Sequence, residues 1–320
     1  MSAVDHNKRV VLSDLSTNEY EHSLDKITLD ALRNIPVLPK LVELVQTPTS
    51  MTARYAMLGS DLRVTERQFS SLYKIFREAC EVLEVPEPLF YISTAPELNA
   101  YTACPDKPII KIYSYLLDIL DEDEIMFVIG HELSHIKSRH LVYTVLGDLI
   151  STGILRVIVT TIPGLGALYT PMEISLNYAF YQWMRASEYT CDRGGFLACQ
   201  NFEASCRALM KLAGYSKTYA NELNLEEFFE QAQAFDDLNE TALGKIQQIL
   251  LSFGQTHPWA VLRARELMKF KNDGNYDKIL RREMQIPELP PSTEITTAPS
   301  ALSSILPKDL KIKNPFSFNK

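Results

Sequence analysis

The feature that most constrains this chain is the pentapeptide His131-Glu132-Leu133-Ser134-His135. In an α-helix, with about 3.6 residues per turn, His131 and His135 lie one above the other on one face, so their imidazoles can converge on a single metal ion. Glu132 flanks that face. In zinc hydrolases this glutamate does not bind the metal but takes a proton from the attacking water and passes it to the leaving amine. The pattern therefore predicts a metal site built on a helix.

The residues before the pentapeptide supply the helix that the motif needs. Asp121 and Glu124 have the spacing of a capping box, which predicts a helix start. The apolar run 125–129 then predicts a buried approach to the motif.

A catalytic zinc ion also needs a third protein ligand. The longer three-histidine motif would place a glycine at position 138 and a histidine at position 141, which are Ser138 and Leu141 here, so that motif is excluded. His140 would point about 140° around the helix from His135, which predicts a helix-end or surface histidine rather than a ligand.

Two carboxylates further along the chain are the remaining candidates. Glu188 and Asp192 are four residues apart, on one face of a predicted helix. Glu188 could complete a site of two histidines and one glutamate, while Asp192 accepts a hydrogen bond from the free ring nitrogen of a ligating histidine. The alternative is a solvated charged helix in which both carboxylates pair with Arg185 and Arg193. The upstream motif favours the metal site.

The order along the chain is helices, a small sheet, then helices. Thr65 to Gln68 predicts a capping box for a helix that runs to about Leu83. Three short β-rich runs then predict a small sheet that includes a hairpin: Leu89–Ser93, Asn99–Thr102 and Ile109–Tyr113. From Ser114 to about residue 270 the pattern is helical, with stops at Gly214 and Gly254. Residues 284–320 are rich in Pro, Ser and Thr, which predicts a flexible tail.

Composition narrows the partners and the compartment. The chain has 32 Lys and Arg against 40 Asp and Glu, a net charge of −8 that argues against nucleic acid as a partner. Five cysteines form no disulfide framework, which is typical of a reducing compartment. The N-terminus lacks the apolar run of a signal peptide, so we expect a cytoplasmic protein.

One apolar stretch raises the question of a membrane. Asp148 and Arg156 interrupt the stretch from Leu141 to Met172. Its longest uncharged run, Val157 to Met172, has sixteen residues, fewer than the roughly 20 apolar residues of a spanning helix. We expect a buried or surface-lying apolar helix followed by a Pro/Gly loop, and peripheral contact with a membrane is the less favoured alternative.

Four ordered stretches resemble the gluzincin peptidases of family M48, which include the heat-shock protease HtpX and the CAAX prenyl protease of the Ste24 type. The stretches are Leu98 to Thr102; Asp123 through the pentapeptide to His140; Trp183 to Arg193; and Thr256-His257-Pro258 followed by Arg263. Together they span roughly residues 60 to 270, and four motifs in order are far more specific than one.

The resemblance implies an α+β, mostly helical, zincin-like metalloprotease domain with a small β-sheet and an HExxH active-site helix. It also implies one Zn²⁺ per chain, held by His131, His135 and Glu188. Glu132 would be the general base, and Asp192 the carboxylate behind a zinc-bound histidine.

Two further positions carry roles that the resemblance suggests. Asn99 would lie on the strand that lines the cleft, where an exposed edge strand can bind an extended protein or peptide substrate; the alternative is an ordinary hairpin strand. His257 would sit in a loop, where it could donate a hydrogen bond to the tetrahedral oxyanion or occupy the fourth zinc position. The alternative for His257 is a structural loop histidine.

The sequence departs from the family pattern in three places. Ser134 stands where a glycine is common, and Ala103-Cys104 stands where a glycine often follows the strand. The clear membrane-spanning helices of HtpX and the Ste24 type have no counterpart here, which favours the soluble or peripheral members.

The sequence as a whole predicts a zinc metallopeptidase domain over residues 1–283, with an N-terminal helical part at about 1–88 and a catalytic core at about 89–272. The predicted function is that of a zinc-dependent metalloendopeptidase, a hydrolase that cleaves protein or peptide substrates. Two alternatives remain: a membrane-associated precursor-processing or quality-control protease, and a non-catalytic zinc-binding scaffold with the same fold.

Overall fold

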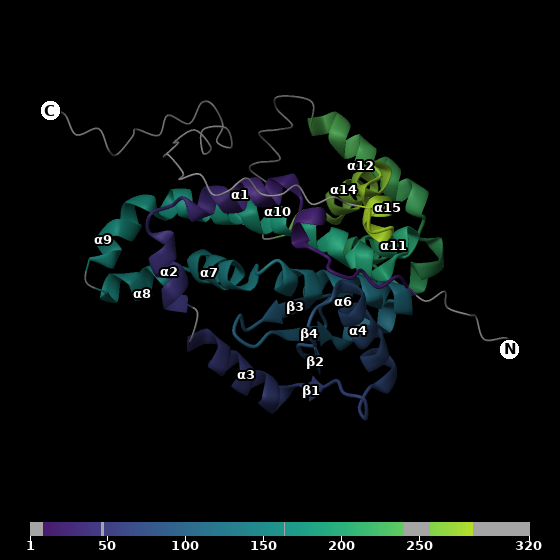
Figure 1. The fold of residues 1–320 in the computed structure, drawn as a ribbon, viewed down its shortest axis with the longest axis horizontal. Helices are drawn as coiled ribbons and strands as arrows, with labels where there is room; N and C mark the ends of the chain where they lie inside the picture. Colours follow the sequence, from purple (N-terminus) through teal and green to yellow (C-terminus); the bar gives the residue numbers. More distant parts are fainter. Residues whose placement is uncertain (1–8, 46–47, 163, 240–256, 284–320) are drawn as a thin grey trace. The chain divides into compact units, whose positions relative to one another are not determined.

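The computed structural model describes residues 9–45, 48–162, 164–239 and 257–283 (Figure 1). Contacts divide the chain into two units, Met1–Met284 and Gln285–Lys320, and the described residues all belong to the first. The predicted tail at 284–320 and the predicted helix stop at Gly254 lie outside the described residues, and both stay predictions.

A four-stranded sheet forms the β part of the fold, in the order β1 (Leu62–Arg63), β2 (Leu89–Ser93), β4 (Ile109–Tyr113), β3 (Ala100–Ala103). β2 and β4 are parallel, whereas β1 pairs antiparallel with β2 and β3 pairs antiparallel with β4. The three predicted strands and the hairpin are confirmed, with β3 beginning one residue later than expected. β3 is an edge strand, so its outer side is open to a further partner.

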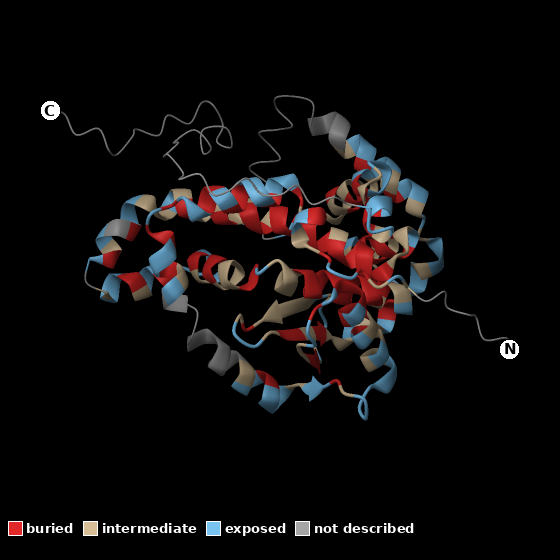
Figure 2. Ribbon diagram, in the orientation of Figure 1, coloured by how far each residue is buried: buried red, intermediate tan, exposed pale blue. Residues whose placement is uncertain are grey.

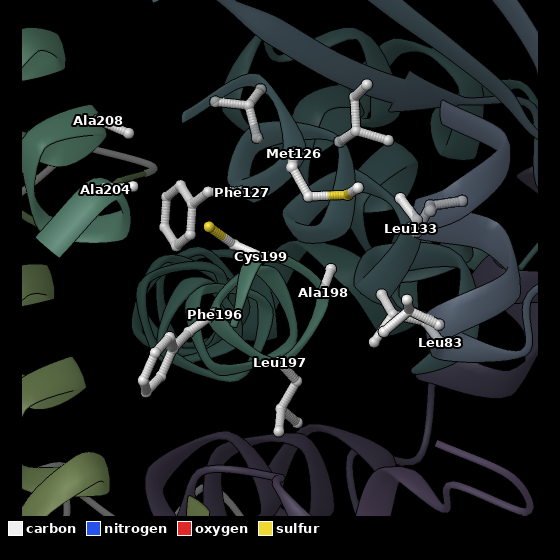
Figure 3. Close-up of a cluster of buried hydrophobic side chains, with 14 of the residues drawn as sticks. Leu83, Met126, Phe127, Leu133, Phe196, Leu197, Ala198, Cys199, Ala204 and Ala208 are labelled. Carbon is white, nitrogen blue, oxygen red and sulfur yellow. The ribbon is translucent and has the colours of Figure 1, made fainter. Parts of the chain in front are cut away.

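Two long helices, α6 (Glu122–Lys137) and α10 (Glu173–Cys199), pack against each other beside this sheet, and β3 contacts α6. Glycines allow the close approach, because a Cβ at Gly130 would overlap Ala198 and a Cβ at Gly195 would overlap the backbone of Phe127. Figure 3 shows the apolar layer around this crossing, with Phe127 of α6 beside Ala204 of α11 (Phe202–Ala213) and with Phe196 and Leu197 from α10. Buried residues run through both long helices (Figure 2).

The remaining helices cover this centre. They are α1 (Ser23–Arg33), α2 (Leu38–Val45), α3 (Pro48–Ser60), α4 (Ser70–Leu83), α5 (Ser114–Ile119), α7 (Leu141–Ser151), α8 (Ile154–Thr161), α9 (Leu165–Tyr169), α12 (Leu225–Asn239), α14 (Ala260–Asn272) and α15 (Asn275–Leu280), with short 3-10 turns at Thr17–Glu19, Thr170–Met172 and Lys217–Glu222. The fold is therefore mostly helical with one small mixed sheet, as predicted, and Gly214 follows α11 as expected.

The start of α4 differs from the expectation. Thr65 and Gln68 pair with each other across a tight turn, and the helix begins only at Ser70. Phe69 has a left-handed backbone conformation, with φ of 61°, and separates the turn from the helix. The two residues therefore close a turn instead of capping a helix.

The apolar stretch from Leu141 to Met172 forms several short helices instead of the expected single helix. α7 and α8 meet at a 92° bend, where Gly153 takes a positive φ of 73°. No single helix in the described part of the chain is long and apolar enough to cross a bilayer, and α7 and α8 satisfy that test only as a bent pair. Leu146, Leu155 and Trp183 belong to a second apolar cluster, which joins α2 and the α7–α9 segment to the first half of α10. The expected cytoplasmic location stays a prediction.

Candidate active site

α6 carries the pentapeptide and starts as predicted. Asp121 Oδ1 accepts from the Glu124 backbone N–H at 2.9 Å, and Glu124 Oε2 accepts from the Asp121 N–H at 2.9 Å. This capping box is confirmed. Glu124 is fully buried and also pairs with Arg207 and Lys211 of α11. The start of the helix is thereby fixed, and His131 and His135 face one direction from its second half.

Glu188 of α10 reaches both histidines. Its Oε2 lies 3.5 Å from His131 Nε2, and its Oε1 lies 3.4 Å from His135 Nε2. Two tetrahedral zinc ligands at about 2.0–2.2 Å from the ion lie roughly 3.3–3.6 Å from each other. The spacing of these nitrogen and oxygen atoms is therefore that of ligands around one ion.

The chemistry of Glu188 also fits a cation. The side chain is buried, yet its Oε2 makes no hydrogen bond of acceptable geometry, although His257 Nδ1 lies 2.9 Å away. Burial opposes ionisation, but the charges of His257, His135 and His131 hold the pKa of Glu188 well below its usual range. An ionised, buried carboxylate oxygen without a hydrogen-bond donor suits a metal ligand.

Asp192 lies behind His131, one turn along α10 from Glu188. Its Oδ1 is 3.0 Å from His131 Nδ1. Arg263 of α14 holds the carboxylate through two hydrogen bonds, at 2.7 Å and 2.9 Å. Burial by itself would raise the pKa of Asp192, but Arg263 and His131 lower it. The alternative of a solvated charged helix is wrong, because Glu188 and Asp192 are both buried.

His140 was expected at a helix end or on the surface, and only the surface alternative is wrong. α6 ends at Lys137 and Arg139 takes a positive φ of 56°, so the helical rotation does not extend to residue 140. His140 instead stands at the N-cap of α7, where it is buried with 1% of its surface exposed. Its Nδ1 lies 3.4 Å from His135 Nδ1, and its Nε2 lies 3.2 Å from Asp25 Oδ2 of α1. Burial lowers the pKa of His140 despite the nearby carboxylate.

Cys191 gives a second possible set of donor atoms. The donor atoms of His131, His135 and Cys191 all lie within 4.8 Å of one another. Burial, with the nearby charge of Glu188, raises the pKa of the Cys191 thiol well above its ordinary value. Glu188 approaches both histidines at 3.4 Å and 3.5 Å, and on this geometry we take Glu188 rather than Cys191 as the third donor.

Thr102 is a further residue of the site, and no role was predicted for it. Its Oγ1 donates a hydrogen bond to Glu132 Oε2 at 2.6 Å, from β3 to α6. Glu132 is itself buried and lines both cavities with His131, one of which His135 also lines. The strand pattern and the family motif Leu98 to Thr102 both include Thr102, but nothing in its spacing from Glu132 indicates a contact.

Two cavities meet at these residues. One, of about 320 Å³, is lined by residues 99–103 together with α7 residues, among them Asp148. The other, of about 370 Å³, has a mostly apolar lining that includes Leu116, Phe127 and Trp259. Asn99 and His257 line both cavities, so the structure brings all seven predicted site residues to one region.

Comparison with known proteins relates the sequence of this chain to one family. The sequence model described as peptidase family M48 matches residues 66–271. Plastoglobule-localized metallopeptidase 48, chloroplastic, of Arabidopsis thaliana is 30% identical over 276 residues, covering 85% of this chain and 78% of the relative.

Bacterial relatives are also similar to this chain. A protease HtpX homolog of Polynucleobacter necessarius is 26% identical over 67% of this chain and 78% of the relative. A protease HtpX homolog of Thermodesulfovibrio yellowstonii is 32% identical over 31% of this chain and 36% of the relative. No solved structure gives a significant match.

Proposed function

Because this chain belongs to peptidase family M48 and is a metalloprotease, we propose that it is a zinc-dependent endopeptidase whose metal is held by His131, His135 and Glu188. The observation that carries the proposal is the approach of Glu188 to both histidines at 3.4 Å and 3.5 Å, with an oxygen that lacks a hydrogen bond. One Zn²⁺ per chain fits this donor set of two imidazoles and a carboxylate.

Zinc in such a site polarises the scissile carbonyl and lowers the pKa of a coordinated water toward ~7. The protein keeps the histidines in place for this chemistry. Asp192 accepts a hydrogen bond from His131 Nδ1, which leaves Nε2 unprotonated and directed toward Glu188. Arg263 keeps the Asp192 carboxylate ionised and fixed in orientation.

Glu132 is the proposed general base. Its carboxylate takes a proton from the attacking water and delivers it to the nitrogen of the leaving amine. The hydrogen bond from Thr102 holds one carboxylate oxygen and leaves the other for this proton transfer. Glu132 is one residue from His131, so the base and the metal ligands share one rigid helix.

His257 is the proposed donor to the carbonyl oxygen as negative charge develops there. Its Nδ1 contacts Glu188 Oε2 at 2.9 Å, and its side chain remains 62% exposed and lines both cavities. The charge of Glu188 raises the pKa of His257. A donor aimed at a developing oxyanion stabilises the transition state more than the substrate.

The substrate is proposed to bind as an added strand beside β3. The Tyr113 N–H donates to the Asn99 carbonyl at 3.1 Å. In an antiparallel pair, every second residue directs its N–H and C=O toward the partner strand, so the N–H and C=O of Ala100 and Thr102 point to the open edge of β3. An extended peptide can pair with these groups while its side chains enter the two cavities. The side chain of Asn99 would face the same peptide.

The test is cleavage of casein by purified wild-type protein and by Glu132→Gln, with zinc content measured in both. The substitution removes a base and no ligand, so we expect equal zinc and a loss of about 10²–10⁴-fold in turnover. Full activity of Glu132→Gln at equal zinc would contradict the assigned base. Zinc binding without turnover in the wild type would instead indicate a non-catalytic scaffold.

A further inference from the structure

The two proposed histidine ligands have different partners at their second ring nitrogen. His131 Nδ1 contacts the carboxylate of Asp192 directly at 3.0 Å. His135 Nδ1 lies 3.4 Å from another imidazole nitrogen, His140 Nδ1. A ligating histidine generally needs an acceptor at this position to fix its tautomer and ring orientation. His140 Nδ1 is in position to be that acceptor for His135.

Asp25 determines which nitrogen of His140 can accept. The Asp25 side chain is fully buried and its Oδ2 lies 3.2 Å from His140 Nε2. Trp183 Nε1 donates to Asp25 Oδ1 at 3.0 Å, and Thr190 Oγ1 donates to Oδ2 at 2.6 Å. These donors from α10 stabilise Asp25 as a carboxylate, which can only accept.

The proton positions then follow along the chain of contacts. The Asp25 carboxylate accepts from His140 Nε2–H, so His140 Nδ1 carries a lone pair. That lone pair accepts from His135 Nδ1–H, and His135 Nε2 is left unprotonated, 3.4 Å from Glu188 Oε1. Cys191 Sγ, 3.6 Å from His140 Nδ1, is a weak donor to the same acceptor.

We propose that Asp25 and His140 are positioning residues that orient His135 for zinc, through a relay from α1 to α6. The proposal rests on the proposed zinc site. It assigns a role in that site to α1, which lies outside the residues 66–271 matched by the family model. Each zinc-binding histidine is then backed by a buried carboxylate, one in direct contact and one through a second imidazole.

The test measures the zinc affinity of the full-length protein by competition with a chromophoric chelator. Asp25→Asn keeps the side-chain volume, and His140→Phe keeps a ring but removes both nitrogens. We expect each to weaken zinc binding about 10–100-fold, the range seen when the partner of a metal ligand is lost. The double variant should be no weaker than His140→Phe alone, because both residues act on His135 through the same contact.

Glu19→Gln is the matched control. Glu19 is also a buried carboxylate of the N-terminal segment, but it pairs with Arg282 at 2.9 Å. We expect this variant to bind zinc as the wild type does. Thermal unfolding of the metal-free proteins is measured in parallel, since a role in folding alone would lower the unfolding temperature and leave the zinc affinity of the folded protein unchanged.

Wild-type zinc affinity in either Asp25→Asn or His140→Phe would overturn the relay. If Asp25→Asn does not fold, His140→Phe decides alone, because it leaves α1 intact. His135→Ala separates this result from a failure of the proposed function. If His135→Ala binds zinc normally, the zinc site itself is misassigned. If it loses zinc while both relay variants keep wild-type affinity, only the relay is wrong.

Discussion

At the scale of single residues, the identity of the third donor to the metal is the sharpest question. Glu188 and Cys191 lie one turn apart on α10, and both come close to the two histidines. We predict that Glu188→Gln weakens zinc binding by more than the roughly 10–100-fold typical of changes outside the ligand set. Cys191→Ser should retain zinc. The reverse result, measured by chelator competition, would make the cysteine the ligand.

His257 gives a second prediction at this scale. If the side chain donates to the developing oxyanion, His257→Ala lowers kcat about 10²–10³-fold with little change in KM. Zinc content should stay at one ion per chain, because His257 is not in the proposed ligand set. An increase in turnover on removing the side chain would show instead that it caps the fourth zinc position.

At the scale of elements, the distance between α6 and α10 sets the site, because the histidines and Glu188 come from different helices. A Cβ at Gly194 would overlap Ser134 Oγ, so the serine of the motif packs directly on this glycine. We predict that Gly194→Ala costs about 1–3 kcal/mol of unfolding free energy and also weakens zinc binding. Urea unfolding measures the first effect and chelator competition the second.

Two further variants make this prediction specific. Adding Ser134→Gly to Gly194→Ala removes the overlapping atoms, so the double variant should recover zinc binding. Gly59→Ala, also in a helix but with open space around the glycine, should be neutral or stabilising. Unchanged zinc affinity in Gly194→Ala would mean that the helix spacing does not control the site.

The open edge of β3 leads to a prediction about the substrate. Ala100→Pro removes an N–H that faces outward while leaving the ladder with β4 intact, so it should raise KM about 5-fold through the loss of one hydrogen bond. Ala100→Val, which keeps the N–H, should leave KM near the wild-type value. Equal KM in both variants would argue against strand addition at this edge.

At the scale of the whole molecule, a side-chain contact joins α14 to the residue that caps α1. Glu266 of α14 lies 3.3 Å from His22, which caps α1, and 2.9 Å from Lys269. Burial by itself would raise the pKa of Glu266, but these partners lower it from 4.5 to about 2. A carboxylate with a lowered pKa stabilises the fold above its unfolded pKa, and this contribution is lost as the pH falls from about 4.5 to about 2.

Glu266→Gln should therefore lower the unfolding free energy by about 3 kcal/mol at pH 7, and by less than half of that at pH 3. Glu230→Gln, at an exposed position on α12, is the control. Urea unfolding at the two pH values measures both. An equal loss at pH 7 and pH 3 would show that the effect of Glu266 is packing rather than charge.

The features that could be predicted from the sequence are those formed by residues close to one another along the chain. The capping box at Asp121, the helical histidine pair and the strand runs each depend on residues within a few positions of one another. The surface position predicted for His140 was wrong for a local reason. Arg139 has a left-handed backbone conformation, which ends the regular helical rotation before residue 140.

Contacts between distant segments could not be predicted in this way. Asp25 and His140 are far apart in sequence, as are Asp192 and Arg263, and no periodic pattern relates the members of either pair. Thr102 reaches Glu132 only because the sheet places β3 against α6. Local chemistry thus identifies the candidate ligands and Asp192 behind them, whereas the contacts of Arg263, Thr102, Asp25 and His140 depend on how the helices and strands pack.

X-ray absorption fine structure of the zinc-loaded, full-length protein measures whether His131, His135 and Glu188 hold the zinc ion. We expect a first shell of nitrogen and oxygen atoms only, at about 2.0–2.2 Å, with outer scattering from two imidazoles. A sulfur neighbour at about 2.3 Å would place Cys191 on the metal and rule out this ligand set.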